Sequence, residues 1–307
     1  MIYSSVCKAK AREALRGHWQ TALLIALIVN LPSLLVQGIA AFTKNDPTLR
    51  LEDLLIRASS NEAAMAALPD ALRAMLSETG VLVIIGLTVL AWVMTPALSL
   101  GMNHWALDRI RGQEEPVSAV FSRIRIFAKG IGLRLFVLLK TLLWMLPGIA
   151  VTLLSLIPLY TARPASVSEA RSTVWISTSL IYTGMILMLV LGIMGYLYYA
   201  MADFILADEP EERVLTCARR SRDMMKGRRG LLMTLMLSFL LWYLLILLAT
   251  SAVVSIAGPV AALVVQMLGS LAVSVYMLMA QGAFYEAFSP VRSSVSPAPE
   301  DSAGLDE

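Results

Sequence analysis

Three polar side chains stand at similar places near the ends of long apolar runs, and they are the residues best placed to do chemistry. His104, Asp203 and Gln281 each follow a methionine by two residues. An unpaired polar group in hydrocarbon costs several kcal/mol, so such groups turn toward protein or water. We therefore predict that the three converge in a polar vestibule, where Asp203 paired with His104 would respond to pH near neutrality. The alternative is that they lie among headgroups on separate helix faces.

The sequence lacks the motifs of the common hydrolases and nucleotide-binding enzymes. His18 and His104 are its two histidines and do not form a zinc-protease motif, and no nucleophile elbow or phosphate-binding loop occurs. Cys7 and Cys217 have no spacing that suits a metal, and we expect them to be reduced thiols. These observations predict a protein that is not an enzyme, with no cofactor and no metal site.

The apolar residues are grouped into blocks that match the thickness of a membrane. Hydrophobic residues make up 58% of the 307 residues, in blocks close to the roughly 20 residues that cross a bilayer. We expect six spans, at residues 20–42, 80–107, 131–159, 174–207, 230–257 and 259–288. The predicted fold class is therefore all-α, a polytopic transmembrane helical bundle of about six spans with interfacial amphipathic helices.

The remaining segments divide the chain into three regions. Residues 1–19 form a basic amphipathic segment, residues 20–288 the membrane domain, and residues 289–307 a tail rich in serine, proline and acid that we expect to be disordered. Residues 43–79 are expected to form an extracytoplasmic helical loop. Positive charges concentrate on the other side, which predicts a plasma-membrane protein with both termini in the cytoplasm.

A surface helix is expected over residues 208–227, between the fourth and fifth spans. Asp208 is expected to cap it, Pro210 to lie in its first turn, and Gly227 to end it in the left-handed conformation. An apolar side that includes Val214 and Ala218 would lie in the lipid interface. Its basic residues are candidate contacts for anionic lipid headgroups: Arg219, Arg220, Arg222, Lys226, Arg228 and Arg229. A solvated linker helix is the alternative.

Several motifs resemble those of a known family. They are Tyr199-Ala-Met201, Phe204-Ile-Leu206-Ala-Asp208-x-Pro210, Ala218-x-x-Ser221-Arg222-x-x-Met225-Lys226-Gly227, Leu237-Ser238-Phe239-x-x-Trp242 and Phe284-Tyr285-Glu286. The chain resembles the bacterial integral-membrane family known as domain of unknown function nine-seven-five. The resemblance implies a membrane protein without an established activity. The family's Ile-Pro-Gly-Ile segment is replaced here by Leu191-Gly192-Ile193, so the break between the third and fourth spans stays open.

The sequence indicates a threefold repeat, in which each unit is a basic segment followed by a hairpin of two spans. Such a repeat makes the second, fourth and sixth spans equivalent to one another. Its markers are Arg16-Gly17, Lys129-Gly130 and Lys226-Gly227, each just before an outgoing span. Chance similarity among apolar helices is the alternative.

Three functions compete on these grounds. The first is a non-enzymatic protein that organises lipids or partner proteins at the inner membrane surface. The second is a transporter or permease of small molecules or lipids, which would use helices kinked at Asn30, Pro32, Pro96, Pro147 and Gly148. The third, a membrane enzyme acting on lipid, lacks a nucleophile or metal site. The net charge of +3 is too small to indicate nucleic acid, and membrane lipids are the expected partners.

Overall fold

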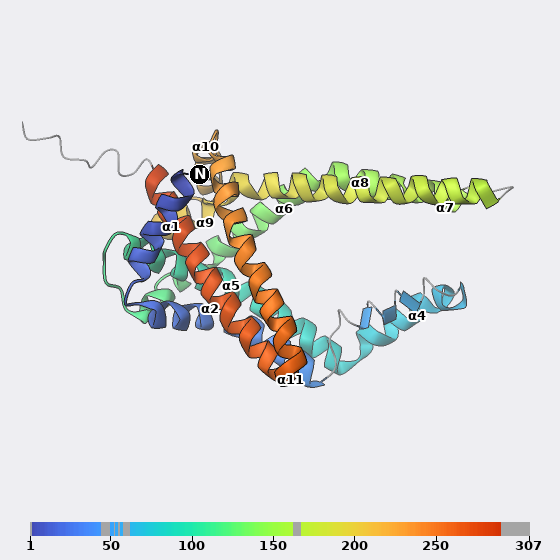
Figure 1. Ribbon diagram of the computed structural model, residues 1–307, viewed down its shortest axis with the longest axis horizontal. Helices are drawn as coiled ribbons and strands as arrows, with labels where there is room; N and C mark the ends of the chain where they lie inside the picture. Colours follow the sequence, from blue (N-terminus) through green and yellow to red (C-terminus); the bar gives the residue numbers. More distant parts are fainter. Residues whose placement is uncertain are drawn as a thin grey trace, which may run out of the picture.

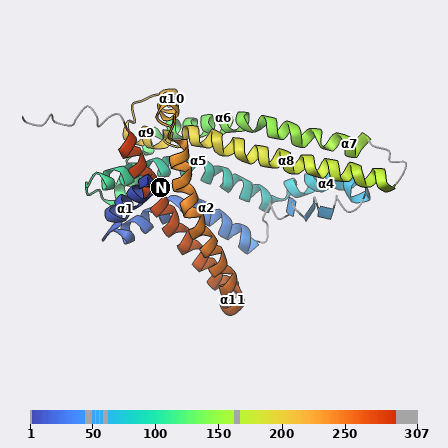
Figure 2. The same cartoon turned by 45° about the horizontal axis from the view of Figure 1, so that its top comes forward.

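The structure is a computed structural model that describes residues 2–43, 50–51, 53–54, 56–57, 62–161 and 167–289. These residues form helices and turns, with no strand among them. Figure 1 shows a compact head from which helical hairpins diverge, and a second view shows the same divergence (Figure 2). Within the described ranges, six helical segments are long and apolar enough to cross a membrane. The predicted all-α, six-span class is confirmed.

Three hairpins carry the six apolar segments. The first pairs α2 (Trp19–Thr43) with α5 (Thr79–Ile110), and α4 (Glu62–Ser77) lies between them in sequence. The second consists of α6 (Phe127–Leu154), α7 (Leu156–Thr161) and α8 (Val167–Tyr199). The third is α11 (Arg229–Phe288), which folds back on itself at Gly258. Parts of the predicted 43–79 loop, and the predicted tail beyond residue 289, lie outside the described residues.

The turn predicted at Gly258-Pro259 is confirmed by its backbone angles. Gly258 has φ 84° and ψ 175°, outside the helical region, and the helix continues on either side of it. A positive φ is easily adopted by glycine because it has no Cβ. Gly17 and Gly227 also have positive φ, 82° and 74°, so the first and third markers of the repeat share a turn. Gly130 lies inside α6 instead, so the second marker does not share it.

The boundaries of the second hairpin differ from the prediction. The sequence predicts one span over residues 131–159, kinked at Pro147 and Gly148. Instead, α6 runs through Pro147 to Leu154, and Pro158 lies in the first turn of the separate helix α7. Proline is tolerated in a first turn because the amide it lacks has no helical partner there. The fourth span also starts earlier than predicted, at Val167, where Glu169 in the first turn of α8 favours helix initiation.

Close backbone contact between glycines holds α6 on α8. A Cβ placed on Gly148 would lie 2.6 Å from the Met188 nitrogen and 2.9 Å from the Gly184 carbonyl oxygen. A Cβ on Gly184 would lie 2.8 Å from the Thr152 nitrogen. The hydrophobic effect does not drive helices together within a membrane, because lipid tails are as apolar as the side chains. Small residues instead let the helices approach closely enough to gain dispersion energy. This packing keeps α6 and α8 antiparallel far beyond the head.

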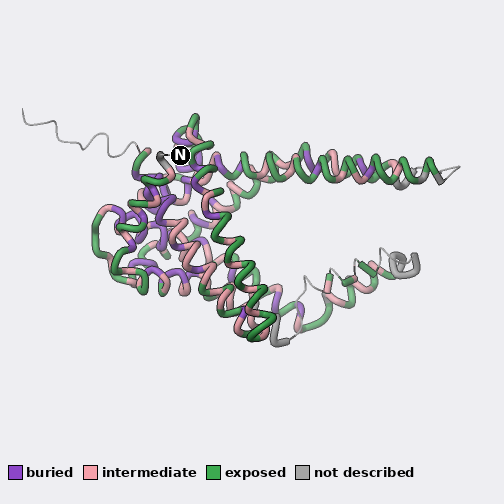
Figure 3. The backbone as a smooth tube through the Cα atoms, viewed as in Figure 1, coloured by how far each residue is buried: buried purple, intermediate pink, exposed green. Residues whose placement is uncertain are grey.

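Buried residues gather in the head, and exposed residues run along the hairpins (Figure 3). Many of the exposed residues are large and apolar. The largest fully buried side chains include Trp105, Phe239 and Tyr285. On α1 (Ile2–Leu15), Cys7, Ala11 and Leu15 recur every four residues and are buried. A helix with that spacing presents one apolar side, and α1 uses it to pack into the head with α11.

The surface helix is shorter than predicted, and its start was wrong. Asp208 is the last residue of α9 (Ala202–Asp208), and the next helix, α10, spans Val214–Met224. Glu209 between them has φ −117° and ψ 80°. A residue before proline is disfavoured in the helical region because the Pro210 ring clashes with it, so the helix ends there. Asp208 therefore caps no surface helix. Gly227 has the predicted positive φ, 74°, but α10 ends three residues before it, at Met224.

The apolar side of α10 was also assigned to the wrong surroundings. Cys217, Ala218, Ser221 and Met224 are buried, and α10 contacts α6, α8 and α9. The sequence pattern predicts an apolar side facing lipid, but the ends of these helices cover it. Leu215 does point outward and is 54% exposed.

Candidate functional site

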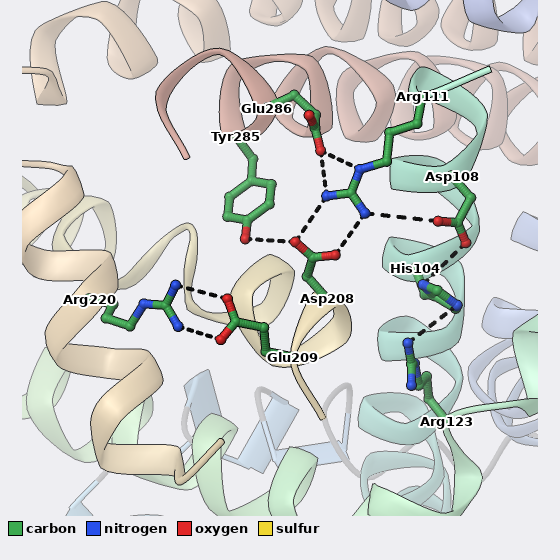
Figure 4. A network of polar contacts seen from close by, with 9 residues as sticks. All are labelled: His104, Asp108, Arg111, Arg123, Asp208, Glu209, Arg220, Tyr285 and Glu286. Carbon is green, nitrogen blue, oxygen red and sulfur yellow. Dashed lines mark hydrogen bonds and ion pairs between the residues drawn. The ribbon is translucent and has the colours of Figure 1, made fainter. Parts of the chain in front are cut away.

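Arg111 lies at the centre of a buried network that joins three helix ends (Figure 4). It donates two parallel hydrogen bonds to Asp208, with Nη1–Oδ1 2.7 Å and Nη2–Oδ2 2.9 Å. Its Nε donates to Glu286 Oε1 at 2.5 Å. Tyr285 Oη donates to Asp208 Oδ2 at 3.2 Å. Arg111 follows α5, Asp208 ends α9 and Glu286 lies near the end of α11, so one guanidinium group connects all three.

The network continues along α5 through Asp108 and His104. Asp108 Oδ1 lies 4.0 Å from Arg111 Nη1, and its Oδ2 lies 3.2 Å from His104 Nδ1. Arg123 approaches His104 from the other side, with Nη2–Nε2 3.3 Å. Because a guanidinium group only donates, the Nε2 that faces it is the acceptor and the ring proton lies on Nδ1, toward Asp108. His104 is therefore neutral in this arrangement.

The charge balance makes Arg111 indispensable to the network. Three carboxylates, on Asp108, Asp208 and Glu286, face it with side-chain exposures of 6%, 12% and 4%. Hydrogen bonds from Arg111 to Asp208, and the charges of Asp208 and Glu286, raise the pKa of the guanidinium group further, so it stays charged. Two-pronged arginine–carboxylate bonds are among the strongest hydrogen bonds in proteins. The arrangement clamps helix ends together, and among the described residues no group of three His, Cys, Asp or Glu could hold a metal ion.

The structure does not form the predicted pair of Asp203 and His104. His104 is paired with Asp108, and the charge that acts on Asp203 comes from Arg134. The cause is helical geometry, since five residues along a helix rotate a side chain by about 140°. Asp208 faces Arg111, so Asp203 on the same short helix α9 faces elsewhere. Gln281 is buried on α11.

The even-numbered spans do converge on a polar cluster, one helical turn beyond the residues that were predicted. Asp108, Asp208 and Glu286 lie four or five residues after His104, Asp203 and Gln281. The signal was present in the sequence, because Asp208 and Glu286 both follow the methionines of the repeat by seven residues. The predicted role of Asp208 as a helix cap was wrong, because its carboxylate bonds Arg111.

Side-chain bonds fix α10 and the preceding turn on the head. Ser221 Oγ accepts from the Met201 amide at 3.3 Å and donates to the Tyr198 carbonyl at 3.1 Å, which satisfies backbone groups at the break between α8 and α9. Arg220 donates to both carboxylate oxygens of Glu209, at 2.6 and 2.8 Å. Lys129 Nζ donates to the Pro210 carbonyl at 2.7 Å.

The six predicted lipid-contacting residues fall into two groups. Arg219, Arg222 and Lys226 are exposed, although Lys226 also pairs with Asp223 at 2.8 Å. The others are partly buried against internal partners: Arg220 on Glu209, Arg228 over the Phe288 ring at 4.5 Å, and Arg229 over the Tyr198 ring at 3.7 Å.

The two cysteines are free and buried, and Cys217 allows a test of the packing of α10. Burial raises the pKa of its thiol from 9.0 to about 11, because the thiolate loses hydration. At pH 8, three units lower, about one thiol in a thousand is ionised. In a Cys7→Ala background we expect maleimide labelling of Cys217 to be at least a hundredfold slower than labelling of Leu215→Cys, which lies exposed on the same helix.

The raised pKa of Cys217 also determines how the stability of the fold changes with pH. A raised thiol pKa stabilises the fold while the thiol is protonated, and this contribution is lost as pH rises from 9.0 toward about 11. The thermal midpoint should therefore fall over this interval, and less so in Cys217→Ala. Equal labelling of the two cysteines in the folded protein would show that α10 does not pack on the head.

The six apolar helical segments, their exposed surfaces and the charge network at one end define an α-helical protein of multi-pass membrane character. The chain belongs to the family described as Protein of unknown function (DUF975), whose model matches residues 1–291. No curated protein and no solved structure matches the chain. Two of the motifs that resembled this family, around Asp208 and Glu286, supply carboxylates to the Arg111 network.

Proposed function

We propose that the protein is a non-enzymatic, multi-pass protein of the bacterial inner membrane that organises anionic lipids, and with them partner proteins, at the cytoplasmic surface. The carrying observation is the outward display of cations on α10 and the turn after it. Arg213 immediately before α10, and Arg219 and Arg222 on it, are exposed, while the head covers the apolar side of the helix. Each basic residue near an anionic membrane surface contributes on the order of 1 kcal/mol.

The proposal places the head on the cytoplasmic side with both termini. The head-side segments carry most of the positive charge, and positive loops are retained in the cytoplasm during insertion.

The transporter alternative receives less support from the kinked helices. Asn30 Nδ2 donates to the Ala26 carbonyl at 2.8 Å, within its own helix. The Gly148 carbonyl accepts from Thr152 Oγ1 at 2.9 Å, and Gly148 itself packs on α8. Backbone groups that line a transport path would instead point toward a water-filled cavity.

The test measures anionic lipid that copurifies with the protein after mild detergent extraction. We expect Arg213→Gln, Arg219→Gln and Arg222→Gln together to reduce bound anionic lipid by at least half. Arg220 is left intact because it bonds Glu209 and supports the fold. The matched control removes three charges at the far ends of the hairpins, with Arg57→Gln, Arg73→Gln and Arg171→Gln. Equal lipid in all three proteins would refute the proposal.

A further inference from the structure

A small basic pocket lies where the second hairpin leaves the head. It has a volume of about 250 Å³, and its lining residues are Trp144, Tyr198, Tyr199, Arg222, Lys226 and Arg229. They come from α6, α8, α10, the turn after α10, and the first residue of α11. Three cations and three aromatic rings thus meet in one concave site. The pocket is separate from the Arg111 network, none of whose side chains lines it.

Arg229 is held in place by an aromatic stack, and its Nε lacks an acceptor. Its guanidinium carbon lies 3.7 Å from the centre of the Tyr198 ring, and that ring stacks on Trp144 at 5.4 Å with an interplanar angle of 27°. The Nε of Arg229 is buried and has no hydrogen-bond partner among the described residues. A buried donor without an acceptor is unfavourable, and a guanidinium group has five donors to satisfy. The site is therefore short of acceptor oxygens.

The other charges around the pocket leave an excess of positive potential. Asp223 pairs with Lys226 and offsets one of the three cations, whereas Arg222 bonds no carboxylate among the described residues. The first amides of α11 begin at the pocket, and the start of a helix carries a partial positive charge that favours anions. A phosphate group, with its negative charge and several acceptor oxygens, matches these demands.

The surroundings indicate that the phosphate belongs to a lipid. Trp144 and Tyr198 are the residue types that gather at the boundary between hydrocarbon and headgroups. Exposed leucines continue along the hairpins away from the head, including Leu146 on α6, Leu189 on α8 and Leu241 on α11. Acyl chains attached to a phosphate in the pocket would lie against such side chains.

We propose that this pocket binds the phosphate of an anionic phospholipid, with Arg229 as the fixed ligand and Arg222 and Lys226 as the adjustable ones. The inference rests on the proposed function and gives it a specific site. Arg229 bonds the phosphate through its unpaired Nε while Tyr198 holds the plane of the guanidinium group. The two exposed side chains close over the headgroup from the solvent side.

The experiment titrates phosphatidylglycerol into the purified full-length protein in a neutral detergent and counts bound lipids by native mass spectrometry. We expect one lipid to bind more tightly than the rest. Arg222→Gln, Lys226→Gln and Arg229→Gln together should weaken that first binding event by about tenfold or more. The matched control, with Arg12→Gln, Arg16→Gln and Arg125→Gln, removes the same charge at exposed positions outside the pocket and should leave the first binding event within about twofold. Phosphatidylcholine should show no preferred site.

Each other outcome overturns a defined part of the proposal. Equal weakening in both triple variants would mean that general charge attracts the lipid, which refutes the pocket and leaves the proposed function intact. Inorganic phosphate that displaces the first lipid at equal concentration would assign the pocket to free phosphate. Absence of any preference for anionic lipid in the unmodified protein would refute both proposals. Should the Arg229 variant misfold, Arg222→Gln with Lys226→Gln, both exposed, carries the same test with a smaller expected loss.

Discussion

Replacing Arg111 with methionine should unfold the head or leave it marginally stable. The substitution removes the shared partner of Asp108, Asp208 and Glu286, all of which are nearly or wholly buried. Breaking a buried ion pair by deleting one partner costs about 3–5 kcal/mol, because the remaining charge stays buried without compensation. This is a large fraction of the roughly 5–15 kcal/mol by which whole domains are stable. Fluorescence-detected size exclusion of the detergent-solubilised protein against temperature measures the loss.

Two further variants separate the loss of charge compensation from the loss of packing. Arg16→Met removes an exposed arginine and should leave the thermal midpoint nearly unchanged. Adding Asp208→Asn and Glu286→Gln to Arg111→Met neutralises the stranded carboxylates and should recover much of the stability, since neutral partners of similar shape cost far less to bury. A triple variant no more stable than Arg111→Met would show that the network does not hold the helix ends through charge.

Gly101→Ala should be the second most damaging single change. Gly101 on α5 lies directly against the short helix η1 (Val117–Phe121). A Cβ there would lie 2.6 Å from the Val120 carbonyl carbon and 2.8 Å from its Cα, and closer still to the carbonyl oxygen. These are backbone atoms, so no side chain can rotate away. Overpacking of this kind costs about 1–3 kcal/mol, and a backbone clash falls at the upper end.

Gly86 on the same helix is the matched control. A Cβ at Gly86 would meet nothing within 4 Å. Alanine is a better helix former than glycine by about 0.8–1.0 kcal/mol in soluble peptides, so Gly86→Ala should be neutral or slightly stabilising. Thermal midpoints of the two variants in one detergent give the comparison. If Gly101→Ala is as stable as Gly86→Ala, α5 and η1 do not pack as described.

The Arg111 network and the basic pocket have different places in the molecule. The network lies within the head and joins the ends of α5, α9 and α11, which belong to different spans. The pocket lies at the edge of the head, where the charges of α10 and α11 meet the aromatic residues of α6 and α8. Disruption of the network should reduce stability, whereas disruption of the pocket should change bound lipid in a protein that remains folded.

The sequence determined the elements that depend on local chemistry. Apolar blocks of sufficient length predicted six spans because the thickness of the hydrocarbon layer sets how many residues must be apolar. Gly258 before Pro259 predicted the turn in α11, and Gly227 predicted a left-handed residue after the surface helix, because each position requires a backbone angle that glycine adopts freely. These features need no knowledge of distant residues.

Only the tertiary structure decided which polar groups meet and what covers each apolar side. The partners of Arg111 lie 97 and 175 residues away in the sequence. Several acidic residues lie near helix ends, so the sequence alone does not identify which of them bond Arg111. Periodicity in α10 showed an apolar side but not whether lipid or protein would cover it, since both are apolar surroundings. Asp208 pairs with Arg111 and does not cap a helix, because the crossing of the spans brings the two side chains together. The spacing of residues along the sequence does not determine how the spans cross.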